Sequence, residues 1–235
     1  MSKRVLANEK IYQKEKNYEL TEAVQILKKA TVTKFDQTVE MQLKLTADPN
    51  SSDQVIRGTT SLPFGTGKSV RVVVISKDES GRKAKDAGAL EVGGNELIEK
   101  IAKGWLDFDV VVAHPNMMKD IAKLGRVLGP KGLMPSPKAG TVTEELGAAV
   151  EEIKKGRIEY KMDKQQNLHA IIGKLSFDNE KLVENGRALI KSVLAAKPKN
   201  FKGALVKGAH MSSTMGPGVR LNLSSIAREE EADNE

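Results

Sequence analysis

The sequence contains no cysteine, which excludes disulfide bonds, thiolate metal sites, iron–sulfur clusters and thiol nucleophiles together. Aromatic residues make up only 4% of the chain, with a single tryptophan, so aliphatic side chains must build the core. No uncharged apolar run approaches the roughly 18 residues that a membrane-spanning helix needs. Residues 1–10 hold no apolar stretch typical of a signal peptide. We therefore expect a soluble protein of the cytoplasm that has no membrane partner.

Charge is the strongest signal in the composition. The formal net charge is +7, and it would be +11 without residues 228–235, which hold one arginine and five acidic residues. A basic body of this kind favours a polyanionic partner, most often nucleic acid, although many basic proteins bind none. The acidic segment at 228–235 has the composition of a disordered tail.

The central part of the sequence alternates between buried-type strands and amphipathic helices. Residues 70–76 and 109–113 are almost uniformly apolar and rich in β-branched side chains, as in strands covered on both faces. Helices are predicted over 95–104 and over 143–156, the second with Glu145 in its first turn. Such repeated units predict a mostly parallel sheet between two layers of helices, a Rossmann-like three-layer arrangement.

The two flanks of the sequence show a different pattern. Residues 36–46 alternate strictly between apolar and polar side chains, which is typical of a strand with one buried and one solvent-facing side. Residues 157–162 and 168–172 repeat this pattern, and the second of them places His169 on the polar side. A long helix is predicted over 178–196. The flanks therefore predict an antiparallel sheet packed against helices.

The similarity of the two flanks predicts one domain that is split in the sequence by an inserted second domain. The expected split α+β domain comprises residues 1–66 and 157–235, and the expected inserted Rossmann-like domain comprises 67–156. Glycines mark both boundaries. The fold class is predicted to be α/β overall.

No catalytic or cofactor motif is evident. The segment Gly-Thr-Gly-Lys-Ser at 65–69 lacks the earlier glycine of a phosphate-binding loop, and a predicted strand rather than a helix follows it. No Gly-x-Gly-x-x-Gly opens the central region, and the three histidines lack metal-ligand spacing. We expect no enzyme activity, cofactor, metal or small-molecule substrate. A doubly wound nucleotide-dependent enzyme and a general RNA- or DNA-binding regulator are the alternatives.

Three segments fit contact with nucleic acid. Phe35 is one of nine aromatic residues, and stacking on a base contributes about 1–3 kcal/mol, although such a phenylalanine is more often part of a core. Residues 212–218 predict a turn with bare backbone amides, which suits close approach to ribose and phosphate; the alternative is a plain hairpin connection. The loop at 125–135 contains Arg126 and Lys131 and is either a phosphate-contacting loop or an ordered structural one.

At these motifs the sequence resembles the family of bacterial large-subunit ribosomal protein number one, the protein of the mobile stalk beside the tRNA exit site. The matching stretches follow the family order and extend over most of the chain. They are residues 34–39, 52–59, 125–130, 137–142, 156–160, 169–174 and 213–217. The sequence departs from the family pattern after Ile226.

The resemblance implies a split domain with a binding surface for 23S rRNA and an inserted Rossmann-like domain. Carried over motif by motif, the rRNA- and mRNA-binding set is Lys34, Phe35, Thr38, Glu40, Arg157, His169, Lys174, Ser213, Thr214, Met215 and Gly216. It also implies a place in the 50S subunit, assistance in releasing deacylated tRNA from the exit site, and repression of translation of the protein's own operon through its mRNA. Arg126 and Lys131 are candidates for a secondary contact with RNA or exit-site tRNA.

Overall fold

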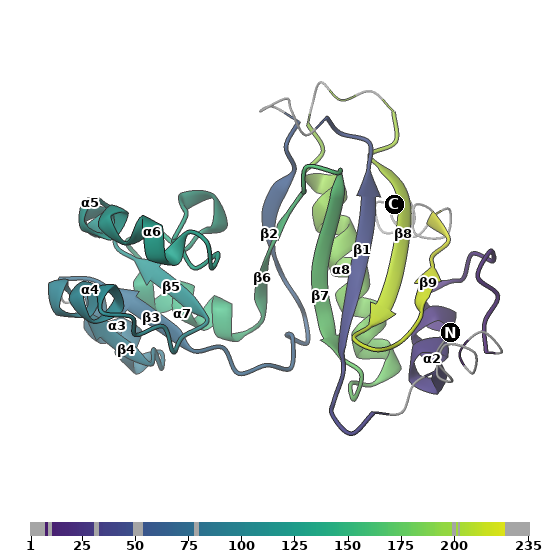
Figure 1. The fold of residues 1–235 in the computed structure, drawn as a ribbon, viewed down its shortest axis with the longest axis horizontal. Coiled ribbons are helices and arrows are strands. Elements are labelled where there is room, and N and C mark those ends of the chain that lie inside the picture. The colour runs from purple at the N-terminus through teal and green to yellow at the C-terminus, as the bar shows by residue number, and fades with distance from the viewer. Residues whose placement is uncertain are drawn as a thin grey trace. The chain divides into compact units, whose positions relative to one another are not determined.

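The computed structural model describes residues 8, 11–30, 33–48, 54–77, 80–198, 201 and 203–223. The acidic segment 228–235 lies outside the described residues, and so do residues 52 and 53 of one family motif. The chain divides into two compact units (Figure 1): the split unit comprises 1–67 and 158–235, and the inserted unit comprises 68–157. The boundaries expected from the glycines each lie one residue from these.

The split unit is built on a four-stranded antiparallel sheet with the order β7-β1-β8-β9. These strands are β7 (Asn167–Lys174), β1 (Thr38–Leu45), β8 (Val206–Ser213) and β9 (Gly218–Arg220). A separate pair is formed by β2 (Arg57–Ser61) and β6 (Arg157–Lys161). The sequence pattern predicted β6 but not β2, because β2 has the burial pattern of a half-exposed strand without large apolar residues.

Two helices, α2 (Leu20–Ala30) and α8 (Asn179–Ala195), cover one face of this sheet (Figure 1). Their apolar sides pack on the alternate residues of β1, which are almost fully buried. Removing that apolar area from water is the main source of stability for such a layer. The residues of β1 that alternate with these buried ones consequently face away from the helices, so the sheet has one covered and one open side.

A buried asparagine fixes the segment that precedes the first unit boundary. Asn185 of α8 is fully buried, and its Nδ2 donates to the backbone oxygens of Gly65, at 2.9 Å, and of Ile172, at 2.7 Å. Its Oδ1 accepts from the backbone nitrogen of Phe64 at 3.1 Å. A buried amide is costly unless its polar atoms are paired, so these three bonds hold residues 64 and 65 against α8 and β7.

The inserted unit contains a parallel sheet with the order β4-β3-β5, covered by helices on both faces. Its strands are β3 (Val72–Ile75), β4 (Glu91–Gly93) and β5 (Val110–Ala113). Alternate residues of β3 pack on opposite layers: one layer contains α3 (Ser80–Asp86) and α7 (Leu146–Lys154), the other α4 (Asn95–Ala102). The α/β fold class predicted from the sequence is confirmed.

The inserted unit contains a series of short helical pieces, and one predicted helix begins later than expected. Residues 115–128 form four short helical pieces in succession: η1 (Pro115–Met117), α5 (Met118–Ile121), η2 (Ala122–Leu124) and α6 (Gly125–Leu128). A further short turn is η3 (Pro137–Ala139). Glu145 is the N-cap residue of α7 rather than part of its first turn, because Val142 is still extended and bridges to Ala113.

Asp109 joins the starts of β3 and β5 in the inserted unit. Its Oδ1 accepts from Lys68 Nζ at 2.6 Å, and its Oδ2 accepts from the backbone nitrogen of Arg71 at 3.1 Å. The hydrogen bond from Lys68 is the largest cause that lowers the pKa of Asp109 from 3.8 to about 2, and the bonds from Arg71 add to it. The charged carboxylate is therefore favoured in the folded chain.

We predict that Asp109→Asn lowers the free energy of unfolding of the inserted unit at neutral pH and makes that free energy depend less on pH in the acidic range. Because folding lowers the pKa of Asp109, its stabilising contribution is complete above about pH 4 and is lost as the pH falls through about 2. Urea unfolding followed by tryptophan fluorescence measures this unit, since the single tryptophan, Trp105, packs against Phe108 there. Identical slopes of unfolding free energy against pH in both proteins would contradict the prediction.

Candidate nucleic-acid interface

The side of the four-stranded sheet that α2 and α8 leave uncovered, called the open face below, carries a regular array of polar side chains. The strand register arranges them in rows across the sheet. One row is His169, Gln42, His210 and Arg220, and the next is Ile171, Glu40, Ser212 and Gly218. Gln42 Nε2 donates to Ser212 Oγ at 2.8 Å and so connects the two rows.

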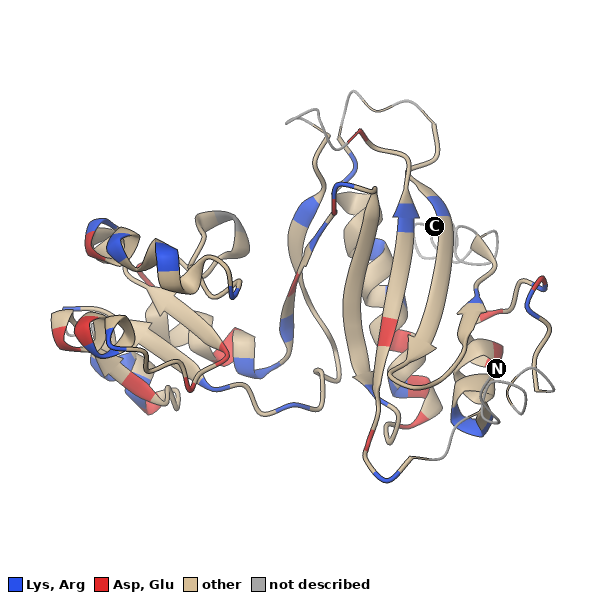
Figure 2. Ribbon diagram, viewed as in Figure 1, with Lys and Arg blue, Asp and Glu red and all other residues tan. Residues whose placement is uncertain are grey.

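Charge on the open face is sparse and mixed. The central strand β1 contributes one acid and one base, Glu40 and Lys44 (Figure 2). On β8 and β9, His210 lies opposite Arg220. Burial of the ring, and secondarily the charge of Arg220, lower the pKa of His210 below its ordinary value of 6.5. These two effects favour the neutral ring of His210, which can both donate and accept a hydrogen bond.

Thr38, the first residue of β1, joins three segments at one end of the open face. Its backbone nitrogen donates to Thr214 Oγ1 at 3.1 Å, and its backbone oxygen accepts from the Thr214 nitrogen at 3.1 Å. Its own hydroxyl accepts from Lys174 Nζ at 2.9 Å. The beginning of β1, the end of β7 and the turn after β8 are thereby held together.

The turn that follows β8 has a second attachment to the segment before β1. The Met215 nitrogen donates to Gln37 Oε1 at 2.9 Å, and Gln37 is almost completely buried. Within the turn, the Gly216 nitrogen donates to the Ser213 oxygen at 3.0 Å. The turn is the hairpin connection between β8 and β9, and these bonds attach its residues 214–216 to Thr38, Gln37 and Ser213.

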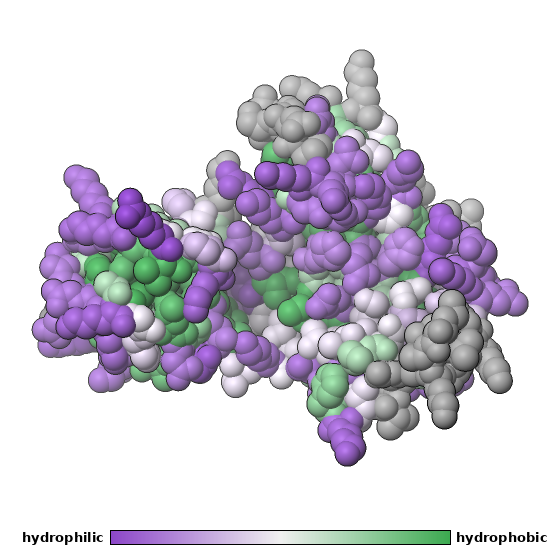
Figure 3. Space-filling view, in the orientation of Figure 1, coloured by the Kyte–Doolittle hydropathy of each residue, from purple (hydrophilic) through white to green (hydrophobic). Residues whose placement is uncertain are grey.

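Large apolar side chains are exposed at the same end of the sheet. Phe35 is 54% exposed, Met215 43% and Ile171 42%. Figure 3 shows mainly hydrophilic residues over this unit, with hydrophobic atoms reaching the surface near the end at which β1 begins. Of the two interpretations of Phe35, the core one is wrong: the side chain is at the surface. Apolar groups exposed on a rigid scaffold are a common mark of an interaction site.

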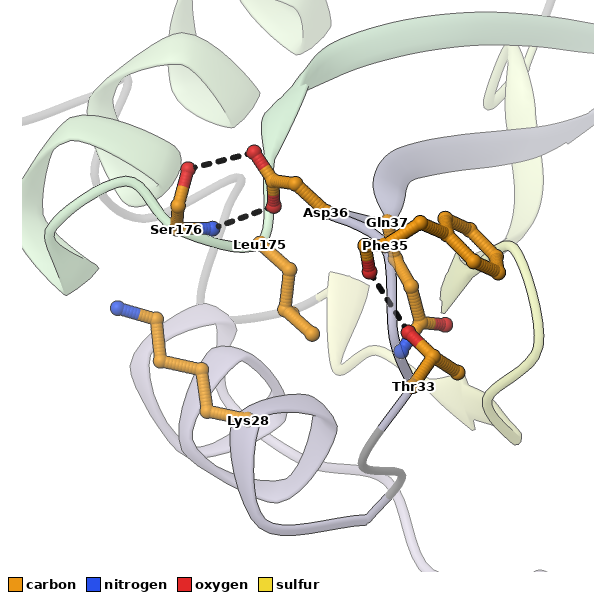
Figure 4. A pocket seen from close by; sticks show the side chains of 7 residues that line it. All are labelled: Lys28, Thr33, Phe35, Asp36, Gln37, Leu175 and Ser176. Atoms are coloured by element: carbon orange, nitrogen blue, oxygen red, sulfur yellow. Dashed lines mark hydrogen bonds between the residues drawn. The ribbon is translucent and has the colours of Figure 1, made fainter.

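The segment that presents Phe35 is hydrogen-bonded on both sides of that residue. Asp36 accepts from the nitrogen of Ser176 at 3.1 Å and from its hydroxyl at 2.7 Å, while Thr33 Oγ1 donates to the Phe35 oxygen at 2.7 Å. Figure 4 shows the Phe35 ring pointing away from Asp36 and Leu175. A hollow of about 340 Å³ lies beside it, lined by Lys28, Thr33, Phe35, Asp36, Gln37, Leu175 and Ser176.

The structure brings most of the sequence-predicted residues to this end of the split unit. Those that lie together, on the open face or at its end, are Phe35, Thr38, Glu40, His169, Lys174, Thr214, Met215 and Gly216. Lys34 is exposed in the segment just before β1. These residues come from three parts of the chain that only the sheet brings together.

Ser213 requires a correction. Its side chain is 4% exposed, and its Oγ has no hydrogen-bond partner among the described residues. Ser213 lies on the covered side of β8 with Ala209 and Met211, so its hydroxyl cannot reach a ribose or a phosphate. Its neighbour Ser212 is the hydroxyl on the open face.

Arg157 and the two secondary candidates lie elsewhere. Arg157 begins β6, which belongs to the two-stranded sheet, and its guanidinium forms an ion pair with Glu152 at the end of α7. It is therefore not part of the open face. Arg126 in α6 and Lys131 in the following turn are both exposed in the inserted unit.

Sequence reasoning missed four polar residues of the two rows on the open face: Gln42, His210, Ser212 and Arg220. The alternation of 36–46 already places Gln42 beside Thr38 and Glu40, so a signal for it was present. The alternation of β8 already places His210 and Ser212 on one side of that strand, but their pairing with β1, and that of Arg220 with His210, depends on register, which no periodicity within one strand specifies.

Among the described residues there is no group of three or more histidine, aspartate or glutamate side chains that could hold a metal ion. Over the same residues, no helix combines the length and the apolar character needed to span a bilayer. The arrangement offers hydrogen-bonding, apolar and cationic groups on one rigid surface.

Comparison with known proteins agrees with the resemblance described above. The sequence pattern that defines the Ribosomal protein L1p/L10e family matches residues 27–217. The chain is 49% identical over 226 residues to the large ribosomal subunit protein uL1 of Phytoplasma australiense, an alignment that covers 96% of this chain and 99% of that protein. The chain therefore belongs to the ribosomal protein L1p/L10e family.

Proposed function

We propose that this chain is a structural protein of the large ribosomal subunit that binds 23S rRNA of the mobile stalk with the open face and the turn at 214–217. Family membership and the name of the 49% identical relative support a place in the large subunit. The observation that supports this binding surface is the set of hydrogen bonds from Thr38 to Thr214 and Lys174, together with the bond from Met215 to Gln37. These bonds hold Phe35, Met215 and the turn in one fixed arrangement. The protein would work in the cytoplasm as part of the ribosome.

The chemistry of the surface suits recognition of RNA by shape. Exposed Lys34 and the ammonium of Lys174 would meet phosphates, which fix register but carry no sequence information. Hydroxyls at the surface, with His169 and His210, would bond riboses, and contact with the 2′-hydroxyl distinguishes RNA from DNA. Phe35 and Met215 would pack on riboses or bases. A nucleotide-dependent enzyme has no comparable support, because this family consists of ribosomal structural proteins.

The same surface would also serve in translational control. We propose that an mRNA segment of the protein's own operon folds into a shape like that of the rRNA site and binds the same residues. One surface then has two competing RNA ligands, so free protein accumulates on the messenger only when rRNA sites are filled. Occupation of the messenger would repress its translation.

In the inserted unit, Arg126 and Lys131 are proposed to contact deacylated tRNA at the exit site and assist its release. Both are exposed cations in a glycine-rich segment, so they can reach a phosphate without a large desolvation cost. Because the chain has no native cysteine, Lys131→Cys accepts a photocrosslinker at one position only. On assembled ribosomes this label should crosslink exit-site tRNA, whereas one at exposed Lys103→Cys should not; equal yields from both positions would contradict the contact.

We predict that Thr214→Val weakens binding to a stalk rRNA fragment about tenfold, which corresponds to about 1.4 kcal/mol. Valine keeps the size of the side chain but removes the hydroxyl that bonds to both backbone groups of Thr38. Filter binding or fluorescence anisotropy measures the dissociation constant, and circular dichroism checks the fold. Thr60→Val on β2, away from the open face, is the matched control. An unchanged dissociation constant in the Thr214 variant would remove the basis of the site.

Messenger binding is predicted to respond to the same substitution. The leader of the operon should displace the rRNA fragment from the protein, and Thr214→Val should lower both affinities by a similar factor, because both RNAs use one surface. A reporter gene fused to that leader measures repression in cells. Loss of rRNA binding with full repression retained would show that the messenger is bound at a different site.

A further inference from the structure

The turn after β8 contains a close contact between Gly216 and the buried side chain of Ser213. A Cβ atom built on Gly216 would lie 2.2 Å from Ser213 Oγ and 3.4 Å from Ser213 Cβ. The first distance is far inside van der Waals contact. Gly216 does not have a positive φ, so its backbone conformation alone does not require glycine. The size of the side chain at position 216 is instead limited by the space between the turn and Ser213.

The side chain that limits this space is buried in the split unit. Ser213 is 4% exposed on the covered side of β8, where Val39 of β1 is its register partner. Its backbone oxygen accepts from the Gly216 nitrogen at 3.0 Å, which closes the turn over its own side chain. The hydroxyl has no hydrogen-bond partner among the described residues, so its removal breaks no bond that they provide.

We propose that the buried side chain of Ser213 restricts position 216 to glycine, because only a residue without a Cβ lets the turn at 214–217 lie close enough to β1 to bind RNA. A larger residue there would lift the turn off Ser213. The bonds from the nitrogens of Thr214 to Thr38 and of Met215 to Gln37 would then lengthen together. This inference deepens the proposed function and rests on it, since the turn is taken to contact RNA.

Three explanations of why position 216 is glycine predict different results in a double-mutant cycle. If the Ser213 side chain excludes a Cβ at position 216, Gly216→Ala should weaken rRNA binding about tenfold or more. Ser213→Ala alone should then leave binding unchanged, and the double variant should recover most of the affinity. If the Ser213 hydroxyl bonds RNA directly, Ser213→Ala alone should weaken binding. If RNA itself needs the space above Gly216, the double variant should stay as weak as Gly216→Ala.

A matched control is available in the inserted unit, away from the open face. A Cβ on Gly147 in α7 would make only ordinary contacts, at 3.5 Å or more, so Gly147→Ala tests the general effect of a glycine-to-alanine change and should leave the affinity unchanged. Circular dichroism and urea unfolding on each full-length variant establish that the fold is retained. Loss of binding in Ser213→Ala, or no recovery in the double variant, would overturn the proposal.

A second readout separates this inference from the proposed function. Amide hydrogen exchange of Thr214 and Met215 reports the attachment of the turn without any RNA. Exchange at both amides should accelerate in Gly216→Ala and return toward the wild-type rate in the double variant. That result together with failure of the wild-type protein to bind stalk rRNA would retain the packing role and reject the RNA function. Unchanged exchange in Gly216→Ala would reject the packing role itself.

Discussion

The hydrogen bonds at Thr38 are the constraint on which the candidate interface depends. They connect β1 to the turn after β8 through Thr214 and to the end of β7 through Lys174, which are segments more than 130 residues away in the sequence. Without this connection and the bond from Met215 to Gln37, Phe35 and Met215 would lie on independent loops. An RNA partner would then have to order both loops on binding, at a cost in conformational entropy. A surface already fixed before binding avoids most of that cost.

The two units differ in what they can offer a large ligand. In the inserted unit, helices cover both faces of the parallel sheet, so only loops and helix surfaces remain for contact. In the split unit, α2 and α8 cover one face of the antiparallel sheet and leave the other with two rows of mostly polar residues. This asymmetry follows from the sequence. Uniformly apolar strands must be buried on both faces of the sheet, whereas strictly alternating strands need burial on one face only.

Much of this arrangement could be predicted from residues, and the rest depended on register. The alternation of 36–46 predicted the open face through Thr38, Glu40 and Gln42, while the partnership of Gln42 with His210 required the pairing of β8 with β1. Ser213 was misjudged as a ligand because the composition of the turn outweighed the alternation with Ala209 and Met211, which already placed it inward. The strand β2 was missed because its residues lack an apolar pattern.

The measurement that tests the account most directly is a salt series of binding to a stalk-region rRNA fragment, compared with an unrelated RNA duplex of equal length. The account predicts that binding to the stalk fragment survives competition by the duplex. It also predicts a shallow dependence on salt, because only a few phosphates contact a surface with so few cations. Equal affinities for the two RNAs that fall together as salt rises would mean that charge alone attracts RNA, and would contradict recognition by the open face.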